Sequence, residues 1–281
     1  MKRWLVASGS SSKELAKSFA DGLNAELLDI DVKVFPDGES KLRITGEVLN
    51  KPVILIQSTY PPVDRHLIQL LLLAHRLSEE GGEVHALIPY LAYARQDKEF
   101  LKGEVVSLGV LSHLLRSVGV KRMVTVDIHS SQGLGYFSFP TYSVSAISLI
   151  AEYFKHHYRL KDPIAASPDF GGSTRVEAFA KILGIEHIVL KKSRDRVTGE
   201  ITVEEVPSGV EGRDVLIIDD IISTGGSVQK AAVLLKKAGA RKIYAACTHP
   251  ILVEDALKKM EEAGVDECLG TNTIPSPISK I

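Results

Sequence analysis

Two adjacent carboxylates, Asp219 and Asp220, follow an uninterrupted apolar run from Val215 to Ile218. Such a run is typical of a strand whose two faces are both covered in a parallel sheet. The carboxylates therefore stand at the carboxyl end of a predicted strand, which is where open α/β sheets bind ligands. In this position they can accept hydrogen bonds from the hydroxyl groups of a sugar.

A hydroxyl- and glycine-rich turn comes directly after the carboxylates and leads into a helical pattern. Its members are Ser223, Thr224, Gly225, Gly226 and Ser227. Their amides and hydroxyls can surround a phosphate at the amino end of a helix that starts near Ser227. The alternative is that Asp and Ser merely cap this helix, although capping needs only one such residue. Carboxylates for hydroxyls beside amides for a phosphate indicate a phosphorylated sugar as ligand.

A second polar cluster, Arg95, Gln96 and Asp97, comes after the predicted strand at residues 84–88. The guanidinium of Arg95 can neutralise phosphate charge with a fork of donors, and Gln96 can pair with a base edge or a ribose. The alternative is a solvated loop. No Gly-x-x-x-x-Gly-Lys-Ser/Thr sequence is present, so a nucleotide is not held in the P-loop manner.

Two further strand ends carry candidate metal ligands, His129 after Asp127 and Asp169 before a pair of glycines. Magnesium prefers oxygen ligands, so the residue types alone argue against a metal at the histidine. Asp169 can hold a metal or orient hydroxyls of a ligand, and the alternative is that it caps the helix at residue 172.

Parallel sheets must position these residues, because strand-like and helix-like patterns alternate along the chain. The predicted strands are residues 3–8, 52–57, 84–88, 122–127, 163–167, 187–191, 214–219 and 242–248. The predicted helices are residues 12–24, 63–80, 105–118, 145–158, 172–183, 226–238 and 252–263. Ser11 to Glu14 predicts a capping box at the first helix. A boundary near residue 142 predicts two α/β domains, 1–141 and 142–281, each with a mostly parallel sheet flanked by helices.

The two halves also echo each other, since Val124 to Ser130 ends a strand in an Asp and a polar turn as Leu216 to Ser223 does. The echo suggests two similar domains.

Composition excludes several classes of function. The 281 residues include 34 basic and 35 acidic side chains, and the net charge of −1 gives no field that recruits nucleic acid or membrane. The amino terminus is typical of a first strand rather than a signal peptide, and no apolar run has transmembrane length. Cys247 and Cys268 lack metal spacing and are expected to be buried thiols, which fits a reducing compartment. We therefore expect a cytosolic protein.

The motifs resemble those of a known family. Residues 215–228 resemble the phosphoribosyl pyrophosphate binding motif that type I phosphoribosyltransferases and ribose-phosphate pyrophosphokinases share. Arg95 to Asp97, preceded by Tyr93-Ala94, is similar to the pyrophosphokinases alone. The other stretches follow in family order, so the chain resembles a ribose-phosphate pyrophosphokinase, and a different connection at residues 102–104 suggests the archaeal type. This resemblance implies two similar domains of type I phosphoribosyltransferase-like fold.

The resemblance also implies a reaction, the transfer of pyrophosphate from Mg-ATP to the anomeric hydroxyl of ribose 5-phosphate, with AMP as the second product. Arg95, Gln96 and Asp97 are then expected to bind ATP. The stretch from Phe35 to Glu39, by itself typical of a hairpin turn, matches a family loop that reaches the ATP of a neighbouring subunit. A homodimer or larger homo-oligomer is implied, and the residues serving the partner or its ATP are Phe35, Asp37, Gly38 and Glu39.

The remaining roles are carried over in the same way. Asp219, Asp220 and the Ser223–Ser227 turn are expected to hold ribose 5-phosphate, and the metal ligands are His129, with Asp127 orienting its ring, and Asp169. A loop carries Lys192 and Arg194, which are expected to stabilise charge on the transferred group, Arg194 also contacting ribose 5-phosphate. Lys191 is the alternative by one register step, and Asp195 and Gly199 suit a loop that closes over substrates.

Two other functions share parts of this pattern. A phosphoribosyltransferase would use Asp219 to Ser227 but has no use for Arg95 and Gln96. A non-catalytic regulatory relative would keep the fold but tend to lose binding residues, which this chain retains. Family members usually continue beyond the equivalent of Ile281 into a final strand and helix. The resemblance therefore does not extend to an interface or regulatory site formed by that tail.

Overall fold

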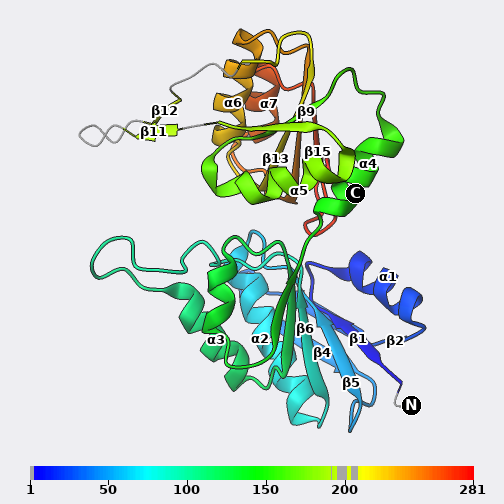
Figure 1. The fold of residues 1–281 in the computed structure, drawn as a ribbon. Coiled ribbons are helices and arrows are strands. Elements are labelled where there is room, and N and C mark those ends of the chain that lie inside the picture. The colour runs from blue at the N-terminus through cyan, green and yellow to red at the C-terminus, as the bar shows by residue number, and fades with distance from the viewer. Residues whose placement is uncertain (1–2, 191, 195–200, 204–207) are drawn as a thin grey trace. The chain divides into compact units, whose positions relative to one another are not determined.

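The computed structural model describes residues 3–190, 192–194, 201–203 and 208–281, with the backbone alone for 192–194 and 201–203. The chain divides into two compact units, Met1–Val144 and Ser145–Ile281 (Figure 1). The boundary expected at residue 142 falls within a strand that pairs with the sheet of the first unit, which is why that unit extends to Val144. None of the described helices combines the length and the apolar character that crossing a membrane requires.

The first unit is a parallel sheet of six strands in the order β2-β1-β5-β6-β7-β8. Its strands are β1 (Leu5–Ser8), β2 (Glu26–Leu27), β5 (Pro52–Ile56), β6 (Glu83–Ile88), β7 (Arg122–Val126) and β8 (Thr141–Val144). Its helices are α1 (Lys13–Leu23), α2 (Val63–Glu79), α3 (Ser107–Ser117) and the 3-10 helix η1 (Ser131–Tyr136). An antiparallel hairpin, β3 (Asp29–Val34) and β4 (Ser40–Thr45), lies outside this sheet.

The second unit is a parallel sheet of five strands in the order β10-β9-β13-β14-β15. Its strands are β9 (Ile164–Ser167), β10 (Glu186–Val189), β13 (Asp214–Ile222), β14 (Lys242–Pro250) and β15 (Glu267–Gly270). Its helices are α4 (Ile147–His157), α5 (Ser173–Leu183), α6 (Gly226–Lys237), α7 (Ala256–Glu262) and the 3-10 helix η2 (Phe170–Gly172). A second antiparallel hairpin joins β11 (Lys192–Arg194) to β12 (Ile201–Val203).

The apolar runs form the buried strands because both faces of each sheet are covered. In β13, Val215 and Ile217 pack into one hydrophobic cluster, while Leu216 and Ile218 pack into another. The alternation follows from the opposite directions of successive side chains in a strand. The predicted parallel sheets flanked by helices are therefore confirmed.

The predicted strands and helices are present with ends shifted by a few residues. Sequence patterns missed the strands β3, β4 and β8, because these strands alternate between exposed and half-buried residues and lack a continuous apolar run. The short strands β2 and β15 were missed as well. The predicted capping box was wrong. Ser12 is the N-cap residue of α1, but its hydroxyl accepts a hydrogen bond from the Ser58 amide at 2.9 Å and does not cap the helix.

The two units repeat one topology. Strands β10-β9-β13-β14-β15 take the order of β2-β1-β5-β6-β7, and each unit inserts its hairpin between the second and third strands of the matching set. The echo between residues 124–130 and 216–223 compares non-equivalent strands, because β13 corresponds to β5 rather than to β7. The similarity of the units rests on their topology and not on that short match.

Candidate functional site

The carboxyl edge of the second sheet brings together three predicted site residues. Strands β9 and β13 are parallel neighbours, with Ile217 opposite Ala166, so their carboxyl ends lie at the same edge. Asp169 follows the end of β9. Strand β13 pairs with β14 as far as Ile222, so the two carboxylates form part of the strand instead of following it. The pair extends beyond the last paired residue of β9, and Asp169 lies near enough to Asp219 for their charges to interact.

The electrostatics of this edge are dominated by the carboxylate pair. Burial, followed by repulsion from Asp220, raises the pKa of Asp219 well above its ordinary value, while Arg175 opposes the rise. The Nη1 atom of Arg175 lies 3.6 Å from Asp219 Oδ1, and Nη2 lies 3.4 Å from Asp220 Oδ2. Two neighbouring, largely buried carboxylates repel each other, and such an unfavourable arrangement is typical of a functional site.

The sequence patterns did not single out Arg175, which the structure places against both carboxylates. It lies in the first turn of α5, where the positive end of the helix dipole disfavours a cation. The sequence already indicates this unfavourable position, because the predicted helix begins at residue 172 and Arg175 falls in its first turn. Only the tertiary structure, however, gives the arginine its two carboxylate partners.

The Ser223–Ser227 turn leads from β13 into α6 as predicted. The N-cap residue is Gly225, with a φ of 76°, so the cap position has no side chain that could make a capping hydrogen bond. A Cβ atom on Gly225 would lie 3.1 Å from Met260 Cγ, so the left-handed turn and its close packing both favour glycine. The interpretation that Ser or Asp merely caps this helix was therefore wrong, and the amino end of α6 is suited to bind an anion.

Asp169 does not cap a helix through its side chain either. It is the N-cap residue of η2 without a side-chain capping bond, and its carbonyl accepts a hydrogen bond of 2.7 Å from the Ser167 hydroxyl. A Cβ atom on Gly172 would lie 2.3 Å from Ser167 Oγ and 3.4 Å from Arg175 Nη1. Glycine at this position therefore permits the close packing of the Asp169 turn.

The carboxyl edge of the first sheet holds a second cluster of predicted residues. Arg95 and Gln96 are exposed in the loop after β6, and the carbonyl of Asp97 accepts a hydrogen bond of 2.8 Å from the Tyr136 hydroxyl of η1. Because η1 follows β7, this bond joins the loops after two neighbouring strands. The structure thus connects the loop of Arg95 to the segment that begins with His129, itself exposed.

Backbone strain marks both of these loops. Tyr93 has a φ of 63° and Asp127 a φ of 36°, values that residues with a side chain rarely adopt. The Tyr93 hydroxyl donates a hydrogen bond of 2.5 Å to Asp64 Oδ1, which fixes the start of the Arg95 loop on α2. Such strain clusters at ligand-binding sites.

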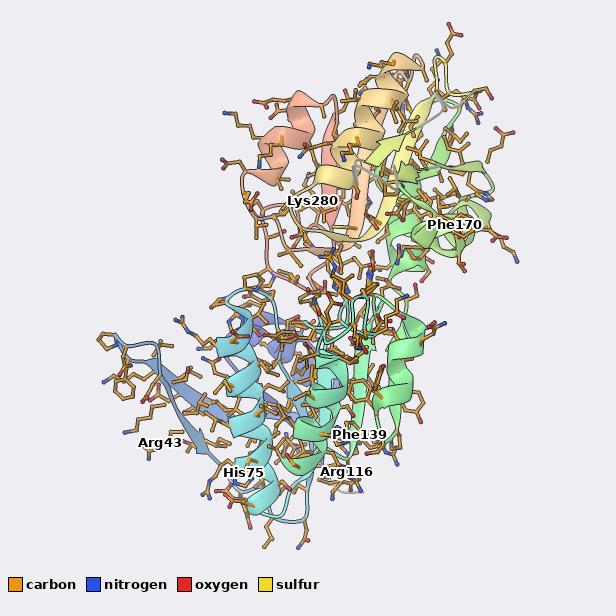
Figure 2. All side chains as sticks on the ribbon, turned by 90° about the vertical axis from the view of Figure 1, so that its left-hand side faces the viewer. Arg43, His75, Arg116, Phe139, Phe170 and Lys280 are labelled. Carbon is orange, nitrogen blue, oxygen red and sulfur yellow. The ribbon has the colours of Figure 1, made fainter. Side chains whose placement is uncertain are left out.

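The stretch from Phe35 to Glu39 forms the tip of the β3–β4 hairpin, where Val34 pairs with Ser40. The tip is closed by a 2.8 Å hydrogen bond from the Phe35 amide to the Glu39 carbonyl and by Gly38, with a φ of 96°. Asp37, Gly38 and Glu39 are exposed. Figure 2 shows the hairpin, which carries Arg43, projecting from the rest of its unit. The hairpin interpretation is confirmed.

The loop with Lys192 and Arg194 is described in part. Backbone pairing joins Lys192–Arg194 to Ile201–Val203, while Lys191, Asp195 and Gly199 lie outside the described residues.

The predicted metal ligands His129 and Asp169 belong to different units. Among the described residues, no group of three or more His, Cys, Asp or Glu side chains could hold a metal by itself. Magnesium usually keeps several waters and binds through one or two carboxylates plus substrate phosphates. The buried carboxylates of Asp219 and Asp220 provide such oxygen donors, so the second unit fits a magnesium ion that is bound together with substrate.

Comparison with known proteins gives one consistent result. Residues 4–119 match the sequence model of the N-terminal domain of ribose phosphate pyrophosphokinase, and residues 190–281 match that of a phosphoribosyl synthetase-associated domain. A ribose-phosphate pyrophosphokinase of Methanothermobacter thermautotrophicus is 39% identical over 279 residues, covering 99% of this chain and 96% of the relative. One of Saccharolobus solfataricus is 37% identical over 272 residues, covering 96% and 93%. The crystal structure of phosphoribosylpyrophosphate synthetase from Mycobacterium smegmatis superposes with a TM-score of 0.88 at 29% identity, covering 100% of this chain and 92% of that one.

Proposed function

The chain belongs to the ribose-phosphate pyrophosphokinase family, and we propose that it transfers the pyrophosphoryl group of Mg-ATP to the anomeric hydroxyl of ribose 5-phosphate. The products are phosphoribosyl pyrophosphate, for nucleotide biosynthesis, and AMP. One observation carries this proposal, the largely buried carboxylate pair of β13 followed by the amino end of α6, whose N-cap residue is a glycine.

In this proposal the second unit binds ribose 5-phosphate. The carboxylates of Asp219 and Asp220 accept hydrogen bonds from the ribose hydroxyls. The 5-phosphate is held by the amides and hydroxyls of the Ser223–Ser227 turn, where the α6 dipole favours a negative charge. The left-handed Gly225 supports this role, because it opens the turn without a side chain over the helix end.

The first unit binds ATP in this proposal. Arg95, Gln96 and Asp97 contact the nucleotide, and the exposure of Arg95 and Gln96 in the strained loop after β6 supports the assignment. The hairpin tip serves the ATP of a neighbouring subunit in a homodimer or larger homo-oligomer. Its projection from the unit and its exposed acidic residues support that role. The tip residues involved are Phe35, Asp37, Gly38 and Glu39.

Magnesium is the proposed cofactor, with His129 as a proposed ligand in the first unit and Asp169 as a proposed ligand in the second. When bound, the ion supplies positive charge that offsets the phosphate oxygens of ATP. The oxygen donors of the second unit support this part of the proposal.

The chemistry requires alignment and charge stabilisation rather than a protein nucleophile. The anomeric oxygen forms a bond to the β-phosphorus and releases its proton, while the bond from that phosphorus to the AMP oxygen breaks. Lys192 and Arg194 stabilise the negative charge that spreads over the pyrophosphoryl oxygens, and Arg194 also contacts ribose 5-phosphate. Removing one such cation typically costs about a hundredfold or more in rate. A cytoplasmic location completes the proposal, supported by two cysteines that are free thiols.

The decisive experiment measures AMP formation from ATP and ribose 5-phosphate with magnesium, repeated across phosphate concentrations. We expect one AMP for each phosphoribosyl pyrophosphate. ADP as the product, or no turnover at any phosphate concentration, would overturn the proposal. Nucleotide formation from phosphoribosyl pyrophosphate and a free base would identify a phosphoribosyltransferase instead.

A further inference from the structure

Arg175 contacts both carboxylates at distances that allow an ion pair but are too long for short hydrogen bonds. Its nitrogens lie 3.6 Å from Asp219 Oδ1 and 3.4 Å from Asp220 Oδ2, beyond the roughly 2.7–2.9 Å of a short charge-assisted hydrogen bond. Its side chain is 16% exposed, so the charges meet largely out of water. The guanidinium therefore orients and neutralises the pair without drawing either carboxylate into a short bond.

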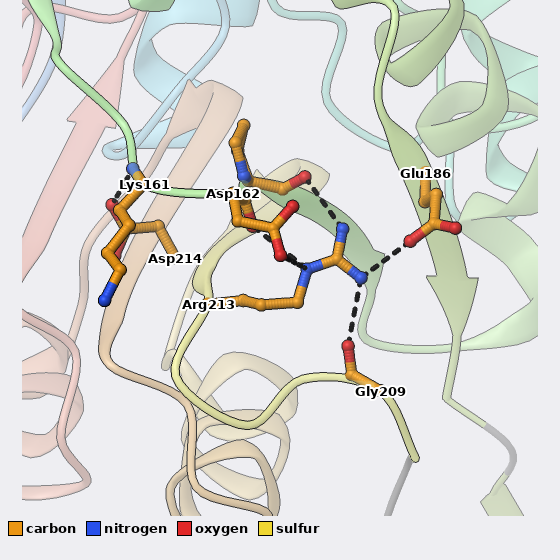
Figure 3. A network of polar contacts seen from close by, with 7 residues as sticks. Lys161, Asp162, Glu186, Gly209, Arg213 and Asp214 are labelled. Carbon is orange, nitrogen blue, oxygen red and sulfur yellow. Dashed lines mark hydrogen bonds and ion pairs between the residues drawn. The ribbon is translucent and has the colours of Figure 1, made fainter.

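Arg213 provides the contrast within the same unit. It is equally exposed, at 16%, but its Nη1 donates a hydrogen bond of 2.6 Å to Glu186 and another of 3.0 Å to the Gly209 carbonyl. Figure 3 shows this guanidinium surrounded by oxygen atoms, including those of Asp162. Arg213 ties together segments near the amino ends of β9, β10 and β13, at the sheet edge opposite Asp219. It is a structural arginine, and Arg175 has a different geometry.

The local setting of Arg175 points to a role beyond the stability of α5. A cation in the first turn opposes the helix dipole, so a helix stabilised for its own sake would carry an acidic residue there. The turn before the helix packs closely, since a Cβ atom on Gly172 would lie 2.3 Å from Ser167 Oγ, and Arg175 Nη1 lies at contact distance of the same position, 3.4 Å away. The turn before α5 thus accommodates a charge that its own helix disfavours.

Ribose 5-phosphate that binds without a metal ion leaves the carboxylates dependent on this counter-charge. Ribose hydroxyls are neutral donors, so they bring no positive charge to the carboxylates when they displace water. Buried carboxylates need a partner of opposite charge or strong donors in fixed positions. We propose that Arg175 is a positioning residue for ribose 5-phosphate, which holds Asp219 and Asp220 in the orientation that accepts the ribose hydroxyls. This inference rests on the function proposed for the site.

The test compares Arg175→Gln and Arg175→Lys with the matched control Arg213→Gln. Arg175→Gln should raise the KM for ribose 5-phosphate about ten- to a hundredfold and leave the KM for ATP within about twofold. Arg175→Lys keeps the charge but loses the fork, so it should recover part of that loss. Arg213→Gln should lower the Tm and leave both KM values unchanged.

A binding measurement separates this inference from the proposed reaction. Ribose 5-phosphate alone, without ATP, should raise the Tm of the wild-type protein, and Arg175→Gln should lose most of that rise. If the wild type shows the rise, the variant loses it and no AMP forms, the reaction is overturned and the role of Arg175 stands. An active Arg175→Gln protein with an unchanged KM for ribose 5-phosphate would overturn the role of Arg175. An Arg175→Gln protein that shows an equal rise in both KM values and the same loss of Tm as Arg213→Gln would also overturn that role.

Discussion

Neutralising Asp219 should stabilise the protein while it disables the proposed site. Burial and repulsion by Asp220 raise the pKa of Asp219, so the native state holds the charged form at a cost. The unfolded chain binds the proton less tightly than the native state. The cost is therefore absent below the ordinary pKa of 3.8 and grows as the pH rises through the folded-state value. Asp219→Asn should remove this free-energy cost of the ionised carboxylate at neutral pH.

The change in unfolding free energy on Asp219→Asn depends on the attraction by Arg175 and on the opposing effects of burial and repulsion by Asp220. At 3.6 Å, the attraction of Arg175 is about 4–5 kcal/mol for an effective dielectric constant of ~20. Because the pKa rises despite this attraction, burial and repulsion together exceed it. Asp219→Asn removes this net cost, while Arg175 keeps Asp220 as its partner. Each unit by which folding raises a pKa corresponds to about 1.4 kcal/mol, so we expect the unfolding free energy to rise by about 1 kcal/mol or more. Loss of a charged acceptor for the ribose should lower kcat/KM roughly 30- to 150-fold.

The assay is denaturant unfolding in EDTA, which keeps metal ions out, at pH 8 and pH 5. The advantage of Asp219→Asn over the wild type should be larger at pH 8. The control is Asp266→Asn, because burial would raise the pKa of Asp266 but the Ile243 amide and Lys236 lower it overall. This control should lose up to about 1 kcal/mol, since its partly exposed ion pair is screened by water. An Asp219→Asn protein less stable than the wild type at pH 8 would refute the reasoning.

The remaining predictions concern the other site residues. Lys192→Ala should lower kcat about a hundredfold while ATP affinity stays within about threefold, and near-normal turnover would exclude the assigned role. Mixing Phe35→Ala with Lys192→Ala protein should restore about a quarter of wild-type activity, because a mixed dimer assembles one complete site. No gain over the separate proteins would contradict service to a neighbour. Gly225→Ala should raise the KM for ribose 5-phosphate about tenfold, because its φ is 76° and its Cβ would crowd Met260. An unchanged KM would argue against phosphate binding by the Ser223–Ser227 turn. EDTA should abolish AMP formation and magnesium restore it, whereas full turnover in EDTA would exclude the metal.

Local sequence patterns predicted the buried strands well and the exposed ones poorly. Val215 to Ile218 forms a strand because four consecutive apolar residues suit a position covered on both faces. Strands β3 and β8 were missed because their neighbours in space, rather than their own residues, make them strands. The capping box predicted from Ser11 to Glu14 failed for a related reason. The Ser11 hydroxyl bonds to Gln57 and to the Ser58 carbonyl, both distant in sequence, instead of capping the helix as the local pattern predicts.

Local sequence patterns were enough to predict the order of the motifs, the parallel sheets and the turn from Ser223 to Ser227, because these depend on residues adjacent along the chain. Which motifs lie next to one another depends on the folding of the whole chain. Asp169 lies beside Asp219 because β9 pairs with β13, and that pairing is a long-range choice that no local pattern encodes. The same pairing places Arg175 of α5 against both carboxylates. Charge balance in the site is a property of the folded chain, since it depends on distances between residues far apart in the sequence.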